Sequence, residues 1–263
     1  MLWRAEQRSK RSSVSSAGFE FIDVYLGATL IGLNDPRGSS TPATHWVACN
    51  TALAGWEGVA TELVTTAGNW SRMQVRIWLS GALARPFLLR PVQGLRNRQE
   101  ASALAVQLAA EATGLAGPCT VWLDGWRCDE ACAAVAMEHK LRNEIELVAR
   151  RRRVRITRLQ PWWAGVLDHA TRSAMSCRLL SVADSDSLTI VSGDAGQIDL
   201  LGSYVPVPSS DQVEAILTRR ALSDDVKPGE IRRVELERSP GAPTPAMASS
   251  PRAPFIKWIG PSA

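Results

Sequence analysis

A chain of 263 residues, of which 45% are apolar, can bury a sizeable core and form one large domain or two small ones. Its net charge of +4 is made up of +3 in residues 1–16, +3 in residues 238–263 and −2 in the body between them. The basic charge therefore belongs to the two ends, which argues against a broad nucleic-acid-binding face. No run approaches the roughly 20 apolar residues that a membrane-spanning helix needs, so we expect a cytoplasmic protein.

Apolar residues alternate, or recur at helical spacing, through the body of the chain. The first part predicts strands over 19–27, 28–34, 44–49 and 73–79 and a helix over 51–67. The middle part predicts strands over 84–91, 119–124 and 154–159 and helices over 98–113, 130–151 and 160–172. The last part predicts three strands within 177–207, a helix over 210–220 and a strand over 231–237.

The helix predicted over 130–151 begins after Asp129, which is a suitable N-cap, and carries an apolar stripe at helical spacing. It would place Cys128 and Cys132 four residues apart, with His139 nearly two turns further on. Such a set raises the possibility of a metal site. Small apolar cysteines also suit the buried side of a helix, and we expect no bound metal.

The order of elements contains an internal repeat. Three strands followed by a helix and a strand open the chain, and the same order recurs near its end. An offset of 158 places Ile22 over Leu180 and Val24 over Val182. A duplicated unit of this kind predicts an α/β protein with a reduced actin-like fold, which consists of two ribonuclease H-like halves with mixed sheets.

This fold suggests a division of the chain. We expect a flexible basic arm over 1–17, a first actin-like half over 18–97, an inserted small α/β subdomain over 98–160, a second actin-like half over 161–237 and a flexible Pro/Ala/Ser-rich tail over 238–263. The tail ends in the apolar cluster PFIKWIG, which contains Phe255 and Trp258. That cluster either docks on a partner or folds back onto its own domain.

Two segments resemble a known family, the actin-like cytoplasmic platform proteins of bacterial type IV pilus and type II secretion systems, typified by PilM and GspL. The first is TVWLDGWRC and its continuation to Asp168, where Gln160, Pro161 and Trp162 match the family's Q-P-aromatic helix start. The second begins IWLSGALARPFLL. The resemblance implies an actin-like fold and a partner whose short cytoplasmic tail is bound in a groove between subdomains.

The residues of the nucleotide pocket depart from that family. Nucleotide-binding members carry an acid two residues before the glycine of the first hairpin, where this chain has Tyr25 before Gly27. The second hairpin offers Asp184 and Asp186 but places Ser185 over Gly27. Magnesium and phosphate need carboxylates and bare backbone. We therefore expect a degenerate pocket, no cofactor and no catalysis.

Two alternatives remain open. Asp184, Asp186 and Gly27 would hold Mg-ATP if the chain is an active ATPase of the same fold. The run from Arg150 to Arg153 would bind phosphates if the chain is a nucleic-acid adaptor, although cations at a helix end also favour the helix dipole.

The prediction from the sequence is a non-catalytic scaffold that binds a segment of an inner-membrane assembly protein in a pilus or secretion apparatus. We expect it at the cytoplasmic periphery of the inner membrane, with its basic ends near anionic lipid and with self-association possible. Trp162 and Trp163 are candidate interface residues together with Phe255 and Trp258, because tryptophan is enriched where proteins meet. Trp162 and Trp163 also suit a core.

Overall fold

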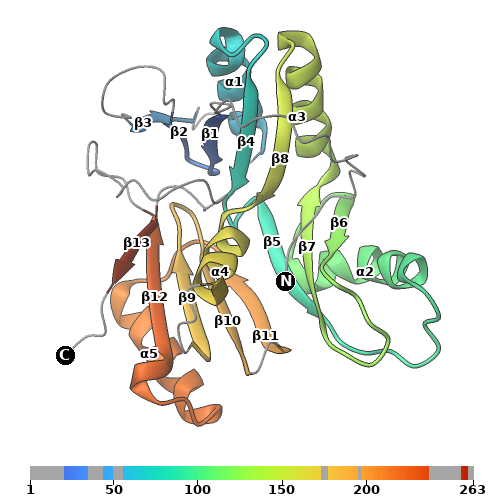
Figure 1. The fold of residues 1–263 in the computed structure, drawn as a ribbon, viewed down its shortest axis with the longest axis vertical. Coiled ribbons are helices and arrows are strands. Elements are labelled where there is room, and N and C mark those ends of the chain that lie inside the picture. Colours follow the sequence, from blue (N-terminus) through green and yellow to red (C-terminus); the bar gives the residue numbers. More distant parts are fainter. Residues whose placement is uncertain are drawn as a thin grey trace, which may run out of the picture.

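A computed structural model describes residues 21–34, 44–49, 56–172, 177–194, 197–236 and 256–259 (Figure 1). The strands are β1 (Phe21–Leu26), β2 (Leu30–Asn34), β3 (Thr44–Ala48), β4 (Gln74–Leu79), β5 (Ala84–Leu89), β6 (Cys119–Leu123), β7 (Cys132–Glu138), β8 (Arg155–Pro161), β9 (Leu179–Ala183), β10 (Leu188–Asp194), β11 (Gln197–Tyr204), β12 (Ile231–Leu236) and β13 (Ile256–Ile259). The helices are α1 (Trp56–Thr66), α2 (Arg98–Thr113), α3 (His139–Arg152), α4 (Trp162–Arg172) and α5 (Ser210–Ser223), with short 3-10 turns η1 (Ala67–Asn69) and η2 (Pro228–Glu230).

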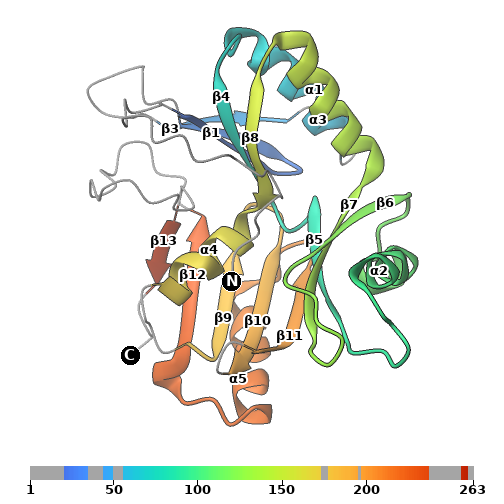
Figure 2. The ribbon, with the colours of Figure 1, turned by 45° about the vertical axis from the view of Figure 1, so that its right-hand side comes forward.

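The first sheet has the strand order β3-β2-β1-β4-β8. β1 pairs antiparallel with β2 and parallel with β4, so the sheet is mixed. α1 and α3 lie side by side against one face of it (Figure 2). Leu63 of α1 and Ile145 of α3 are buried in one apolar cluster with Val24 of β1. Burial of each such side chain stabilises the fold by about 1.5–3 kcal/mol, which explains why this layer forms.

The second sheet has the strand order β11-β10-β9-β12-β13 and is covered by a helix on each face (Figure 2). Leu179 of β9 packs with Leu217 of α5 in one buried cluster. Leu180, the next residue, belongs to the cluster that contains Val166 of α4. Successive side chains of a strand point to opposite faces, so the alternation along β9 separates α4 from α5.

The two sheets have the same connectivity, which confirms the predicted duplication. In each half a central strand pairs antiparallel with the next strand and parallel with the strand after the helix. The register corrects the predicted offset. Leu26 pairs with Ile31 and Ala183 pairs with Leu188, so equivalent residues lie 157 apart, not 158. A slip of one residue exchanges the two faces of a strand, which is why an alignment of apolar residues alone did not fix it.

The third sheet, β5-β7-β6, is antiparallel and packs against α2. It corrects the helix predicted over 130–151, because residues 132–138 form β7 and α3 begins at His139. Ala134 and Ala136 face the α2 cluster, whereas Val135 and Met137 face the main core. A strand buried on both faces has no polar alternation and reads as a helix when it is rich in alanine. Cys128 and Cys132 therefore do not share a helix.

Sheet membership also differs from the expected division of the chain. Residues 84–89, expected in the first half, form β5 of the third sheet. Residues 155–161, expected largely in the insertion, form β8 at the edge of the first sheet, parallel to β4. β8 belongs to the first sheet because it pairs in parallel with β4 from Arg155 up to Pro161, where α4 follows.

The end of the chain returns to its own sheet, because β13 pairs antiparallel with β12. This confirms that the apolar cluster near the C-terminus folds back onto the chain. The backbone of Trp258 pairs with that of Val234. Phe255, the arm over 1–17 and most of the tail lie outside the described residues. In the described part of the chain, none of the helices has the length and apolar character needed to cross a membrane.

Candidate functional site

The turns of the two equivalent hairpins lie against each other at the junction of the two halves. Each turn holds four residues, 27–30 between β1 and β2 and 184–187 between β9 and β10. The backbone N–H of Gly27 donates to the Leu30 carbonyl at 2.8 Å, and that of Asp184 donates to the Ser187 carbonyl at 2.9 Å. The two turns are thus built alike. The structure brings together all four residues predicted for the pocket.

The Asp186 carboxylate joins the second turn to the first. Its Oδ2 atom accepts a hydrogen bond from the backbone N–H of Ala28 at 2.6 Å. Its Oδ1 atom accepts from the Thr29 hydroxyl, also at 2.6 Å. The backbone N–H groups of such a turn are the donors that would cradle a phosphate in an anion-binding loop. Here one of these donors, the backbone N–H of Ala28, donates to the carboxylate of Asp186 instead.

Gly27 allows this close approach. A Cβ atom on Gly27 would lie 2.5 Å from Oδ2 of Asp186 and 2.5 Å from Oγ of Ser185. Real Cβ atoms do not come so close to other heavy atoms, so any side chain here would displace Asp186 and Ser185 from their positions in the contact. The glycine expected to admit a phosphate therefore admits the opposite turn.

Tyr25, at the position of the family's acid, also binds the opposite turn. Its hydroxyl oxygen lies 3.0 Å from Oγ of Ser185, and Ser185 donates its single hydroxyl proton to Asp186 at 2.6 Å. The Tyr25 hydroxyl must therefore donate to Ser185, which gives a chain of hydrogen bonds from β1 to Asp186. The ring is fully buried and meets the ring of Trp162 edge to face, with centroids 6.3 Å apart. Burial raises the pKa of Tyr25 well above its ordinary value.

Asp184 forms a second connection between the halves. Its Oδ2 atom accepts from the backbone N–H of Gly81 at 2.7 Å, in the turn between β4 and β5. Its Oδ1 atom accepts from the backbone N–H groups of Asp186 and Ser187 at 2.8 and 2.7 Å. Burial raises its pKa to about 6, although these donors favour the charged form. Both predicted acids are thus engaged by the protein itself.

Asp23, the earlier acid of β1, does not reach the turns. It accepts hydrogen bonds from Arg76 and Trp78 of β4, the latter at 2.9 Å. Sequence reasoning missed Thr29, Ser185 and Gly81 as members of the contact. The signal available for them was only their position in polar turns that follow buried strands.

The remaining predicted residues are distributed elsewhere. Trp162 is fully buried, so it offers no surface to a partner, and Trp163 lines a cavity beside α4. Arg150 to Arg152 form the last turn of α3, and Arg153 ends it in a left-handed conformation. Arg150 lies 3.7 Å from Glu146 on the same helix. In the described part of the chain, no group of three or more His, Cys, Asp or Glu side chains could hold a metal ion.

Comparison with solved structures identifies the fold. A Bacteroides thetaiotaomicron protein with an actin-like ATPase fold and unknown function matches with a TM-score of 0.57 and 9% identity, over 84% of this chain and 83% of that one. The cytoplasmic domain of EpsL, an inner-membrane component of the Vibrio cholerae type II secretion system, matches with a TM-score of 0.42 and 13% identity over 79% and 77%. The PilM–PilN type IV pilus biogenesis complex matches with a TM-score of 0.49 and 15% identity over 79% and 66%.

No protein-family model matches the sequence, and no curated protein matches it. The first structural match, together with the duplicated sheets, shows that the chain has the actin-like ATPase fold. A fold of this kind hosts different functions, so the function has to be argued from the contact between the two turns.

Proposed function

We propose that this chain is a non-catalytic scaffold, which binds a segment of an inner-membrane assembly protein in a pilus or secretion apparatus. It acts at the cytoplasmic side of the inner membrane, where its basic ends attract anionic lipid by about 1 kcal/mol per cation. The resemblance of residues 120–168 to PilM and GspL proteins supports this class of partner.

The contact between the turns carries the non-catalytic part of the proposal. In an actin-like ATPase the equivalent turns must leave space for phosphate between them. Here Asp186 bridges them through Ala28 and Thr29 at 2.6 Å. A triphosphate could enter only if these hydrogen bonds broke and the turns separated. Each hydrogen bond to a charged group contributes about 1.5–3 kcal/mol, so this separation would oppose nucleotide binding.

Electrostatics oppose the nucleotide as well. Asp184 and Asp186 are both buried, and they face the place where the turns meet. Above a pH of about 6 Asp184 is charged. A triphosphate brought beside these carboxylates would be repelled unless magnesium screened it, and protein donors already engage the carboxylate oxygens. The two acids stabilise the junction of the halves instead.

Isothermal titration of Mg-ATP into the protein tests this part. For the native chain we expect no binding of Mg-ATP with a micromolar Kd. Micromolar binding that disappears in the Asp186→Ala variant would overturn the scaffold proposal and establish an ATPase of the same fold. Phosphate release measured in the same samples tests for ATP hydrolysis, and we expect none.

Binding of a membrane assembly protein tests the other part. The cytoplasmic segments of membrane proteins encoded beside this chain can be made as labelled peptides and titrated with the protein by fluorescence polarisation. We expect one segment to bind in saturable fashion and its scrambled version not to bind. Failure of every such segment would contradict the partner class, whatever the outcome with ATP.

A further inference from the structure

Six exposed arginines lie together at one end of the first sheet. Four of them end α3, one precedes β4 and one begins β8. The backbone N–H of Arg72 donates to the Arg153 carbonyl, and that of Arg155 donates to the Met73 carbonyl, each at 2.9 Å. These bonds hold the end of α3 and the starts of β4 and β8 together, at the top of the molecule in Figures 1 and 2. We call this set, Arg72, Arg150–Arg153 and Arg155, the arginine face.

The positive charge of this face is mostly unpaired. In the part of the chain that the structure describes, Glu146 is the one acid that forms an ion pair with it, 3.7 Å from Arg150, and Glu146 also pairs with Arg142 at 3.0 Å. Residues 17–237 have a net charge of −2, to which the arginine face contributes +6, so the rest of that body has −8. Positive charge is therefore concentrated at one end of an otherwise acidic body.

Local folding does not account for so many cations. The C-terminus of α3 corresponds to about half a negative charge, which one cation in the last turn would balance. Two of the arginines also occupy backbone positions that favour glycine, because the φ angles of Arg72 and Arg153 are 67° and 54°. A guanidinium group thus stands where glycine would suit the backbone better. This indicates that the charge serves a contact with an anionic partner.

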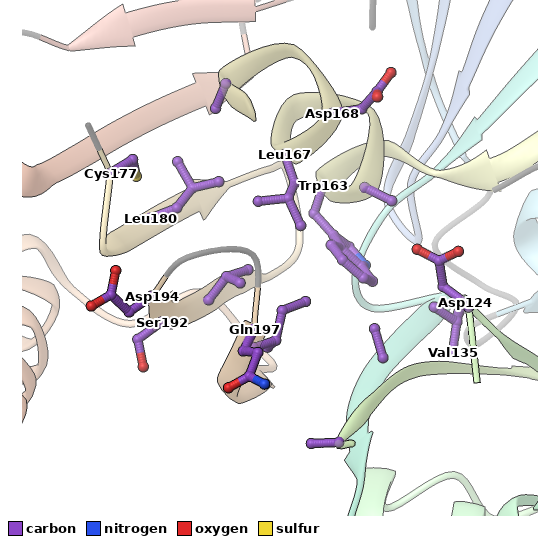
Figure 3. Close-up of a pocket in the computed structure, with 18 of the residues that line it drawn as sticks. Asp124, Val135, Trp163, Leu167, Asp168, Cys177, Leu180, Ser192, Asp194 and Gln197 are labelled. Atoms are coloured by element: carbon purple, nitrogen blue, oxygen red, sulfur yellow. The ribbon is translucent and has the colours of Figure 1, made fainter. Parts of the chain in front are cut away.

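The charges of the cavity beside α4 are used differently. This cavity of about 330 Å³ is lined by Trp163 and Asp194 among others (Figure 3). Asp194 lies 3.9 Å from Arg178, and Glu130, another acid of the lining, pairs with Arg127 at 2.9 Å. These acids are engaged within the protein, whereas the arginine face has charge available for a partner.

Exposed apolar side chains flank the arginine face. Val64 of α1 and Leu147 of α3 are 40% and 36% exposed. Nη2 of Arg152 donates to the Val64 carbonyl at 3.4 Å, and Leu147 lies one turn before Arg151 on the same side of α3. Cations beside exposed aliphatic side chains suit a membrane interface, where headgroups meet acyl chains. Trp70, the aromatic residue nearest to Arg72 in the sequence, is buried and offers no surface on which bases could stack.

The N-terminal arm joins the first sheet at this same end. β1 and β4 are parallel, and Phe21 pairs with Gln74, so both strands start beside the arginine face. Residues 1–16 have a net charge of +3 and include Leu2 and Trp3. Basic and tryptophan side chains are both favoured where a membrane meets water. The arm therefore adds the same chemistry to the same end of the molecule.

We propose that the arginine face docks on an anionic phospholipid membrane, with the N-terminal arm in the same contact. The inference rests on the proposed function at the inner membrane and names the folded surface that meets the lipid. β1 and β4 run from this face to the contact between the hairpins, which follows their other ends. That contact, and the second half beyond it, then face away from the membrane.

Flotation with lipid vesicles tests the proposal. The full chain is mixed with vesicles of phosphatidylethanolamine and phosphatidylglycerol and, separately, with vesicles of phosphatidylcholine alone. We expect binding to the anionic vesicles, weakening as the salt concentration rises, and no binding to the neutral ones. The face variant combines Arg72→Gln, Arg151→Gln and Arg155→Gln, three exposed side chains without an ion pair in the described part of the chain. Each cation contributes about fivefold in affinity, or about 1 kcal/mol, so this variant should bind about 100-fold more weakly.

A control variant removes the same charge elsewhere. It combines Arg90→Gln, Arg96→Gln and Arg219→Gln, which are exposed arginines after β5, before α2 and on α5. Charges further than about 8 Å from the lipid are screened at physiological salt, so its binding should fall by less than about threefold. Circular dichroism shows that both variants are folded. Equal losses in the two variants, or native binding by the face variant, would overturn the proposal.

Two other results would assign the charge to a different contact. If Arg4→Gln, Arg8→Gln, Lys10→Gln and Arg11→Gln together abolish flotation while the face variant floats as the native chain does, the arm alone binds lipid and the proposal fails. If the native chain binds duplex DNA but not the anionic vesicles, and the face variant loses the DNA, the face is a nucleic-acid site and the proposal also fails.

The peptide titration that tests the proposed function contains no lipid, so the two proposals fail separately. If the face variant floats poorly and binds the membrane assembly segment as the native chain does, both stand. If no segment binds but the face variant alone loses flotation, the lipid contact stands and the partner class fails. If a segment binds and the face variant floats as the native chain does, the scaffold function stands and the lipid contact fails.

Discussion

The hydrogen bonds of Asp186 provide the most direct measure of how strongly the two halves are joined. An Asp186→Ala change removes acceptors from Ala28, Thr29 and Ser185 at 2.6 Å each. Asp186 is only 8% exposed, so water cannot readily replace the lost partners. Each charge-assisted bond contributes about 1.5–3 kcal/mol, but bonds to one group are not additive. We expect the free energy of unfolding to fall by about 3 kcal/mol.

Urea unfolding followed by far-UV circular dichroism measures this loss, and thermal unfolding should show a fall of about 6–12 °C in Tm. Asp199→Ala is the matched control, because Asp199 is an exposed aspartate of β11. Its effect should stay within about 0.5 kcal/mol. If Asp186→Ala were no more destabilising than this control, the contact between the turns would carry no energy and the argument from closure would fail.

A double-mutant cycle identifies the partner across the junction. Thr29→Val removes the hydroxyl that donates to Oδ1 of Asp186 and keeps the shape of the side chain. Contacting residues in one network show coupling energies of about 0.5–3 kcal/mol. We expect about 1 kcal/mol between Thr29 and Asp186. Additive effects of the two changes would show that the hydrogen bond between the halves does not form in solution.

Other consequences follow from the same turns. The pKa of Asp184 is raised to about 6, above its value in the unfolded chain. Its contribution to the free energy of unfolding is therefore fully present below about pH 4 and is lost as the pH rises through 6. Urea unfolding across this range should show about 2–3 kcal/mol of pH dependence, which the Asp184→Asn variant should lack. Gly27→Ala should lower the free energy of unfolding by about 1–3 kcal/mol in the same assay, whereas Gly202→Ala, where a Cβ meets nothing within 4 Å, should not. In a Tyr204→Phe variant Tyr25 is the single tyrosine, and its phenolate absorbance at alkaline pH should appear only when circular dichroism reports unfolding.

Much of the fold could be predicted because both halves repeat the same order of strands and helices. Alternating apolar residues located β1, β2, β9 and β10, and Gly114 ends α2 in the left-handed conformation, where a glycine stop was expected. The failure at β7 has a physical cause. Residues 132–138 are buried on both faces and rich in alanine, so neither the period of two nor β-branched composition marks them as a strand.

The candidate site was predictable in its residues but not in its contacts. Tyr25, Gly27, Asp184 and Asp186 were identified from the two turns, and the structure places them together. Which atoms meet depends on a register that differs by one residue from the alignment of apolar positions. The sequence alone also could not show that Ser185 relays the Tyr25 hydroxyl to Asp186, because that depends on the approach of two segments about 160 residues apart.

The corrected register explains why a carboxylate suits the junction. With equivalent residues 157 apart, Thr29 and Asp186 are counterparts, and they are hydrogen-bonded to each other. Residues that lie near a local two-fold axis meet their own counterparts, so two identical turns would oppose donor to donor. An anion between the turns resolves that conflict in a phosphate-binding protein. In this chain the conflict is resolved within the protein, because one turn supplies the N–H of Ala28 and the hydroxyl of Thr29 while the other supplies the carboxylate of Asp186. The two equivalent turns therefore differ at the place where they meet, and the two halves gain a fixed contact there.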